Sequence, residues 1–116
     1  MVLLMGVELI LASSSEVRKE LLEKSNISFL SVKPNIDEDA VKTSLLNENY
    51  SPRDIADALA ELKASKISLK NPDSLVLGCD QILEFEGLIL KKPSSKNIAV
   101  QQLMKISGKK HTTYSA

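Results

Sequence analysis

The stretch from Leu75 to Pro93 constrains the fold more than any other part of the chain. It opens with an apolar run that predicts a buried strand, and Asp80 follows this run in an otherwise apolar segment. A carboxylate in such a place costs free energy unless a neighbour pairs with it, protonates it or uses it. A Glu-Gly pair ending at Gly87 then predicts a hairpin, whose returning strand delivers Lys92. This hairpin would place an acid at one strand end with cations beside it, an arrangement that suits a metal-bound phosphate.

Composition predicts a single globular domain. The chain has 116 residues, of which 43% are hydrophobic and 26% charged, values typical of a folded protein. The formal net charge is zero and aromatic residues make up 3%, so neither bulk attraction to a nucleic-acid polymer nor a set of base-stacking side chains is expected. A single cysteine excludes an internal disulfide.

No segment has the pattern of a membrane span or a targeting signal. No apolar run approaches the roughly 20 residues needed to cross a bilayer. The opening residues 1–6, MVLLMG, are too short for a signal peptide and lack its basic flank, and Met5 is a second candidate start. We therefore expect a cytoplasmic protein with no membrane partner.

Near the N-terminus the pattern predicts a strand, a small polar turn and an amphipathic helix. The strand covers residues 7–12 and the helix begins at Glu16, with three serines between them. Both Ser13 and Ser15 are plausible N-caps. A helix N-terminus can bind an anion, and Arg18 lies in the first turn, where the helix dipole would favour an acid. These features favour an anion at this turn, although three serines that only cap a helix would have the same pattern.

Two further segments follow this helix. Residues 27–33 predict a second strand, and residues 35–39 predict an acidic loop that includes Glu38. Neighbouring acids are usually solvated, and a divalent metal or a sugar hydroxyl is the alternative. Residues 40–50 have a weak pattern, so no structure is predicted for them.

A serine-proline pair at residues 51–52 predicts the start of another helix. Three apolar residues repeat at helical spacing and are expected to face the core: Ile55, Leu59 and Leu62. Lys63 and Lys66 lie one turn apart on the later part of this helix, and from the pattern alone both are expected in solvent.

After the hairpin, residues 96–107 predict a third helix with an apolar stripe, ended by Gly108. Residues 112–116 have the pattern of the beginning of a strand. A strand of which only the start is present would leave its sheet with an exposed edge, which would favour association into a homodimer. We therefore expect an α/β domain in which helices flank a mixed sheet.

Asp80 is the best candidate for a general base. A carboxylate is a weak base at neutral pH, so it needs metal coordination or burial to activate water. The alternative is an aspartate that caps a turn. The sequence predicts a small buried residue at Cys79 rather than a nucleophile, and His111, the sole histidine, leaves too few ligands for a zinc site. The chain contains neither of the common glycine-rich phosphate-binding motifs.

Five ordered groups of residues together resemble the Maf family of nucleoside triphosphate pyrophosphatases. In chain order they are residues 11–15 with Arg18 and 21–22, residues 36–38, residues 63–64, residues 78–81 with 86–87 and 92–93, and residues 107–108 with His111. Five matches at compatible spacings are more specific than any one alone, and they extend from about residue 8 to the end of the chain.

The resemblance implies hydrolysis of a nucleoside triphosphate to the monophosphate and pyrophosphate with a divalent cation, Mg²⁺ or Mn²⁺. It implies one Maf-like, inosine-triphosphatase-like domain over residues 1–116, forming an N-terminal lobe and part of a cleft. Asp80 would be the proton acceptor, and Asp80 and Glu38 would hold the metal. The residues implied in substrate binding are Ser13, Ser15, Arg18, Glu38, Lys63, Gln81 and Lys92.

The chain departs from the family pattern in three ways. Residues 16–17 stand where many members have Pro-Arg, so one phosphate-binding arginine is absent. Gln81 replaces the threonine of the subgroup that acts on thymidine and uridine triphosphates, and is closer to the subgroup for modified guanosine nucleotides such as 7-methyl-GTP. Family members also extend well past residue 116. A truncated, inactive fragment that only binds nucleotide or a partner is therefore the alternative to an active enzyme.

Overall fold

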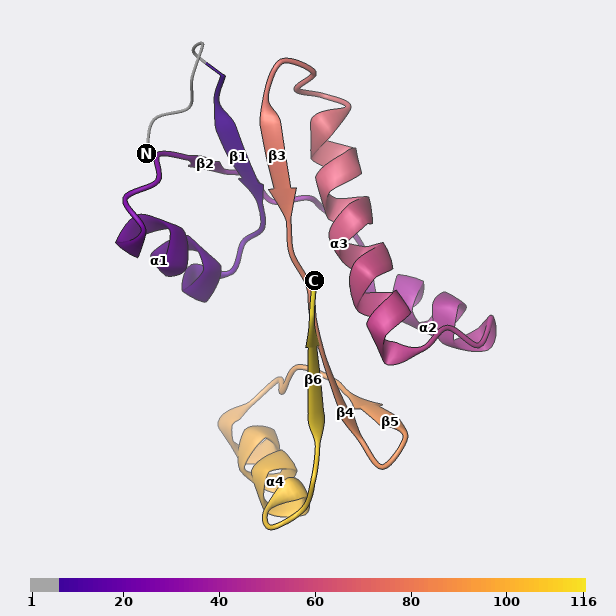
Figure 1. Ribbon diagram of the computed structural model, residues 1–116. Coiled ribbons are helices and arrows are strands. Elements are labelled where there is room, and N and C mark those ends of the chain that lie inside the picture. The colour runs from indigo at the N-terminus through magenta and orange to yellow at the C-terminus, as the bar shows by residue number, and fades with distance from the viewer. Residues whose placement is uncertain (1–6) are drawn as a thin grey trace.

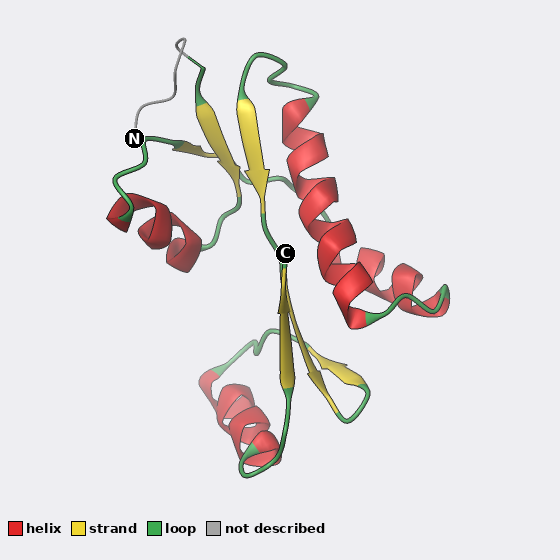
Figure 2. Ribbon diagram, viewed as in Figure 1, coloured by secondary structure: helices red, strands yellow, loops and turns green. Residues whose placement is uncertain are grey.

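The computed structural model describes residues 7–116, which form an α/β fold of two small sheets with helices beside them (Figure 1). In chain order the elements are β1 (Leu9–Ala12), α1 (Glu16–Lys24), β2 (Leu30–Ser31), α2 (Glu38–Asn47), α3 (Pro52–Ser68), β3 (Leu75–Gly78), β4 (Gln81–Phe85), β5 (Leu88–Leu90), α4 (Lys96–Ile106) and β6 (Thr112–Ser115). The predicted α/β class with flanking helices is confirmed. The parallel and antiparallel strands are divided between two sheets (Figure 2).

The parallel sheet has the strand order β2-β1-β3. Ala12 of β1 lies opposite Gly78 of β3, so the carboxyl ends of these two strands meet at the same edge of the sheet. Helix α3 runs alongside β3 (Figure 1), and Ile67 from this helix belongs to a core cluster with Ile10, against which Val76 packs. Residues that follow β1 and β3 are thereby brought together.

Helix α3 begins as the sequence predicts and supports both sheets. The Oγ of Ser51 caps it by accepting a hydrogen bond from the backbone N–H of Asp54 at 3.1 Å. Ile55 and Leu59 are fully buried and form a core cluster with Ile82 of β4. The helix therefore joins the core of the antiparallel sheet to that of the parallel sheet.

Leu62 was predicted to face the core, and this prediction is wrong, because its side chain is 40% exposed. The buried stripe of α3 also contains Ala56, Ala60 and Lys63. This stripe is centred on their side of the helix, which leaves Leu62 at its border.

Gly78 allows α3 to approach β3 closely. A Cβ at this position would lie 2.2 Å from the carbonyl oxygen of Ala60 and 2.9 Å from the Cβ of Ala64. Only glycine has no side chain to occupy that space. The helix segment around residues 60–64 is consequently held against the end of β3.

The antiparallel sheet has the order β5-β4-β6. The predicted hairpin between β4 and β5 is confirmed, since Glu86 and Gly87 have φ values of 50° and 79°. Such a pair of positive φ angles is typical of a tight two-residue hairpin turn. Backbone hydrogen bonds of 2.9 Å run in both directions between Asp80 and Ala116, so the end of β6 lies beside the acid.

The structure differs from the sequence predictions in three segments. Strand β3 was expected to be buried, but Leu75 and Leu77 are 55% and 39% exposed, because β3 is an edge strand with only one face packed on α3. Helix α2 takes up the last two residues of the expected acidic loop and most of residues 40–50, for which no structure was predicted, and Asp37 is its N-cap. The predicted strand over residues 27–33 is reduced to β2.

The chain is more extended than a compact domain of its size. Its radius of gyration is 16.1 Å, whereas about 13 Å is expected for this length. Among residues 7–116 no helix combines the length and apolar character needed to cross a bilayer. The prediction about the start of the chain concerns residues 1–6, which lie outside the described residues.

Candidate active site

Two turns meet at the carboxyl edge of the parallel sheet. One follows β1 and contains Ser13 and Ser15, and the other follows β3 and contains Asp80. Since the last residues of β1 and β3 are paired, both turns begin at the same level of the sheet. This edge therefore brings together the serine turn and the acid that the sequence singled out.

The serine turn is held by hydrogen bonds to its side chains and backbone. Ser13 is 4% exposed, and its Oγ accepts hydrogen bonds from the backbone N–H of Ser15 at 3.1 Å and from Nη1 of Arg18 at 3.5 Å. Ser15 is the N-cap of α1, which decides between the two predicted caps. The Oγ of Ser31 donates to the carbonyl of Ser13 at 2.8 Å. A helix N-terminus and a half-buried arginine thus lie at one turn, as an anion site requires.

Lys63 is buried, contrary to the expectation that it lies in solvent. Only 4% of the residue is exposed. Its Nζ donates to Oδ1 of Asp80 at 3.0 Å and to the carbonyl of Cys79 at 3.2 Å, and it lies 2.8 Å from Oε1 of Glu38. The close approach of α3 to β3 at Gly78 brings the ammonium to these partners.

Asp80 presents two oxygens in different situations. The residue is 5% exposed, and Oδ1 is paired with Lys63. Oδ2 is buried without a hydrogen-bond partner, a state that no other buried side-chain nitrogen or oxygen shares among residues 7–116. Leaving a buried polar atom without a partner costs about 1–3 kcal/mol, and the cost is higher for a charged group. Oδ2 is therefore the natural acceptor for a water, a cation or a substrate group.

Glu38 is half-buried at the first position of α2. Burial raises the pKa of its carboxyl, but the hydrogen bond and positive charge of Lys63, the charge of Lys42 and a hydrogen bond with the Asp80 carboxyl outweigh this effect, so the pKa lies below its ordinary value. Glu38 is consequently ionised at neutral pH and shares one ammonium with Asp80.

The carboxylates of Asp80 and Glu38 are the kind of oxygen ligand that binds a divalent cation. No three His, Cys, Asp or Glu side chains gather into a ready-made metal site in the part of the chain that the structure describes. Magnesium, however, is usually held by one or two carboxylates together with waters and substrate phosphates. The unpaired Oδ2 of Asp80 and the carboxylate of Glu38 are suitable oxygen ligands for such an ion.

Gln81 follows Asp80 in the chain and Lys92 follows the hairpin, but neither side chain is hydrogen-bonded to the Asp80 carboxylate. Gln81 begins β4 opposite Ser115, and its side chain is exposed. Lys92 follows β5 and is also exposed. Within residues 7–116 neither side chain bonds to the other predicted site residues, so the structure brings together Ser13, Ser15 and Arg18 at one turn and Glu38, Lys63 and Asp80 at the other.

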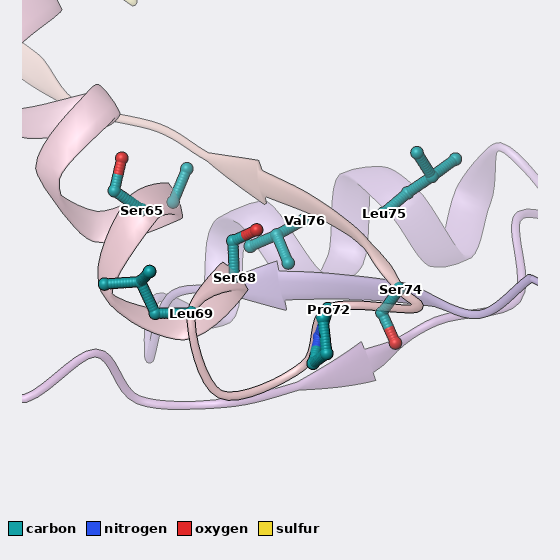
Figure 3. Close-up of a pocket in the computed structure, with 8 residues that line it drawn as sticks. Ser65, Ser68, Leu69, Pro72, Ser74, Leu75 and Val76 are labelled. Carbon is teal, nitrogen blue, oxygen red and sulfur yellow. The ribbon is translucent and has the colours of Figure 1, made fainter.

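A hollow on another part of the molecule contains none of the predicted site residues (Figure 3). It lies between the end of α3 and the start of β3, where Ser65, Ser68, Leu69 and Pro72 line it with Leu75 and their neighbours. The candidate site at the sheet edge is therefore formed without this hollow.

Three supporting contacts were not predicted from the sequence. Ser31 holds the serine turn, the carbonyl of Cys79 accepts from Lys63, and Nζ of Lys66 donates to the carbonyl of Asn35. All three end on a backbone carbonyl oxygen, for which residue type gives no signal. The one-turn spacing of Lys63 and Lys66 could have indicated a shared role, since both hold the segment that leads into α2.

Comparison with known proteins gives consistent matches over nearly the whole chain. The chain is 51% identical over 112 residues to the nucleoside triphosphate pyrophosphatase of Ruegeria sp. (strain TM1040), covering 97% of the chain and 56% of that relative. It is 47% identical over 109 residues to the nucleoside triphosphate pyrophosphatase of Pelagibacter ubique (strain HTCC1062), covering 94% and 56%. It is 45% identical over 112 residues to the 7-methyl-GTP pyrophosphatase of Brucella abortus biovar 1 (strain 9-941), covering 97% and 56%.

The chain thus spans about half the length of the curated relatives that it matches. The family described as Maf-like protein matches residues 8–116, which include both turns of the candidate site. The resemblance inferred from five groups of residues is therefore confirmed, and the chain belongs to the Maf-like protein family.

Proposed function

We propose that the protein hydrolyses a nucleoside triphosphate to the nucleoside monophosphate and pyrophosphate. The observation that carries this proposal is the buried, unpaired Oδ2 of Asp80 at the sheet edge shared with the serine turn. Relatives that are 51% and 47% identical in sequence are named nucleoside triphosphate pyrophosphatase, which supports the same class of reaction for this chain.

The residues of the site divide the work between phosphate binding and water activation. The free N–H groups of α1 and the guanidinium of Arg18 would bind phosphate oxygens, with Ser13 and Ser15 shaping the turn. Asp80 would accept the proton of the attacking water through Oδ2, because Oδ1 is occupied by Lys63. Lys92 and Gln81, both exposed, would meet the far end of the triphosphate and the base.

A divalent cation, Mg²⁺ or Mn²⁺, is part of this proposal, with Asp80 and Glu38 as its ligands. When bound, it would lower the charge on the phosphate oxygens and the pKa of a bound water. The chain's own residues fit it because they offer one unpaired buried carboxylate oxygen and a second ionised carboxylate nearby.

The proposed substrate subgroup is modified guanosine triphosphates of the 7-methyl-GTP type. Gln81 departs from the threonine of the thymidine and uridine triphosphate subgroup, and the Brucella relative is named 7-methyl-GTP pyrophosphatase. A cytoplasmic location, with no nucleic-acid polymer and no membrane as partner, is the remaining part of the proposal.

The test is release of pyrophosphate from 7-methyl-GTP, GTP, dTTP and UTP with Mg²⁺ or Mn²⁺. We expect 7-methyl-GTP to be turned over fastest, and Asp80→Asn to lower kcat at least about 100-fold. Asp73→Asn changes an exposed aspartate in the turn before β3 and serves as the matched control. Turnover that survives in Asp80→Asn would remove the mechanism.

The second candidate is a binding role without turnover for the chain of 116 residues. Its exposed apolar side chains, such as Leu69 and Leu88, favour it because they offer a surface for a partner. The free edge of β3, with Leu75 and Leu77 exposed, would also favour a homodimer. A folded chain that binds triphosphate but releases no pyrophosphate would support this candidate, and a monomeric mass in solution would contradict the homodimer.

A further inference from the structure

We propose that Lys63 is a positioning residue that orients Asp80 and Glu38, and that it does not bind phosphate. This inference rests on the proposed function. It gives Lys63 a different task from substrate binding, which is the role that the family resemblance implies for it. Its basis is the number of partners. An ammonium has three N–H donors, and Nζ of Lys63 has three acceptors in reach: Oδ1 of Asp80 at 3.0 Å, Oε1 of Glu38 at 2.8 Å and the carbonyl of Cys79 at 3.2 Å.

The burial of Lys63 supports the same role. Its side chain is 5% exposed, as is that of Asp80. A buried ammonium is stable only when its charge is balanced and its donors are used. Two carboxylates and one carbonyl satisfy both conditions, so a phosphate would have to displace one of these partners before it could contact Lys63.

The contacts of Lys63 make the two oxygens of Asp80 unequal. The ammonium holds Oδ1, while Oδ2 stays without a partner. The bond to the carbonyl of Cys79 fixes the backbone immediately before the acid. Lys63 thereby determines which oxygen is left for the reacting groups, and positioned groups react faster than mobile ones.

The phosphate-binding cations are then found elsewhere. Among residues 7–116 the guanidinium of Arg18 makes one long hydrogen bond, 3.5 Å, to Ser13, which leaves four of its five N–H donors for phosphate. Lys92 is exposed beyond the end of β5. Both can approach a triphosphate without breaking a buried contact.

The experiment compares Lys63→Met with Arg18→Met in steady-state kinetics and in calorimetric binding of a non-hydrolysable triphosphate analogue. For Lys63→Met we expect kcat to fall at least about tenfold, while KM and the analogue's Kd change by less than about threefold. For Arg18→Met we expect KM and Kd to rise at least about tenfold. Lys70→Met, at an exposed lysine two residues past the end of the same helix, is the control for loss of a positive charge.

A second variant covers the case in which Lys63→Met does not fold. Lys63→Arg keeps the positive charge and hydrogen-bond donors but not the compact geometry of an ammonium. We expect it to lower kcat and to leave Kd unchanged, whereas a phosphate-binding role would leave both close to wild type. A rise in Kd of about tenfold or more in Lys63→Met, or wild-type kcat and Kd in Lys63→Arg, would overturn the inference. A wild-type chain that neither binds the analogue nor releases pyrophosphate would overturn the proposed function, and the inference with it.

Discussion

The carboxyl edge of the parallel sheet and the outer side of α4 are organised in opposite ways. At the edge, Lys63 and Asp80 are almost fully buried and bonded to each other. Along α4, Leu103 and Met104 are 64% and 73% exposed, and Ile106 is the only residue of that helix that is buried. Helix α3, which packs on strands of both sheets and supplies Lys63, therefore connects the buried core to the acid of the candidate site, whereas among residues 7–116 α4 does neither.

The largest expected effect contrasts two leucines, one on each of these helices. Leu59→Ala removes a fully buried side chain of α3 and should lower the free energy of unfolding by about 3 kcal/mol. Leu103→Ala removes a side chain that is 64% exposed and should change it by less than about 0.5 kcal/mol. Urea denaturation followed by circular dichroism measures both. Equal losses in the two variants would show that α4 is packed as firmly as α3.

A smaller effect is expected where α3 approaches β3. Gly78→Ala places a methyl group 2.2 Å from the carbonyl oxygen of Ala60, so the helix must shift, at a cost of about 2–3 kcal/mol. The shift would also separate Lys63 from Asp80 and lower turnover. The measurements are the free energy of unfolding and pyrophosphate release.

Gly87→Ala is the matched glycine variant for this test. A Cβ there meets no atom within 4 Å, and only the positive φ of 79° opposes it. We expect a cost of about 1–2 kcal/mol without loss of turnover. If Gly78→Ala behaved as Gly87→Ala does, close packing of α3 on β3 would not be what positions Lys63.

Local signals were sufficient to predict most elements from the sequence. The serine that precedes Pro52 and the Glu-Gly pair at residues 86–87 each have one strong physical meaning, an N-cap and a tight turn, and both were predicted. Helix α2 was not, because Val41 and Leu45 are its only described residues that pack on the core cluster, and two apolar contacts give little periodicity. Its N-cap at Asp37 was hidden among neighbouring acids.

Burial of charged groups could not be predicted from local pattern. Lys63 lies four residues after Leu59, on the buried stripe of α3, but a lysine there predicts burial only if acids from distant segments meet it, as Glu38 and Asp80 do. Likewise Leu75 and Leu77 have the pattern of a buried strand, while their exposure follows from their place on the face of β3 turned away from α3. Such features depend on contacts between distant segments, which residue type alone does not determine.

The smallest expected effect concerns Glu38 and tests whether its carboxylate is really bonded to Lys63. Its pKa is lower in the folded chain than its ordinary value of 4.5, so ionised Glu38 stabilises the fold above that value and this contribution disappears as the pH falls through the lowered pKa. Glu38→Gln removes the charge at nearly the same size. The Tm advantage of wild type over this variant, measured with a chelator present, should be full near about pH 7 and should vanish towards about pH 3. The effect is small because the Glu38 side chain is 45% exposed.

Glu61→Gln, on the exposed side of α3, is the control for this pH dependence. An advantage that grows as the pH falls would mean that Glu38 is destabilised by its surroundings, and Lys63 would then be balanced by Asp80 alone.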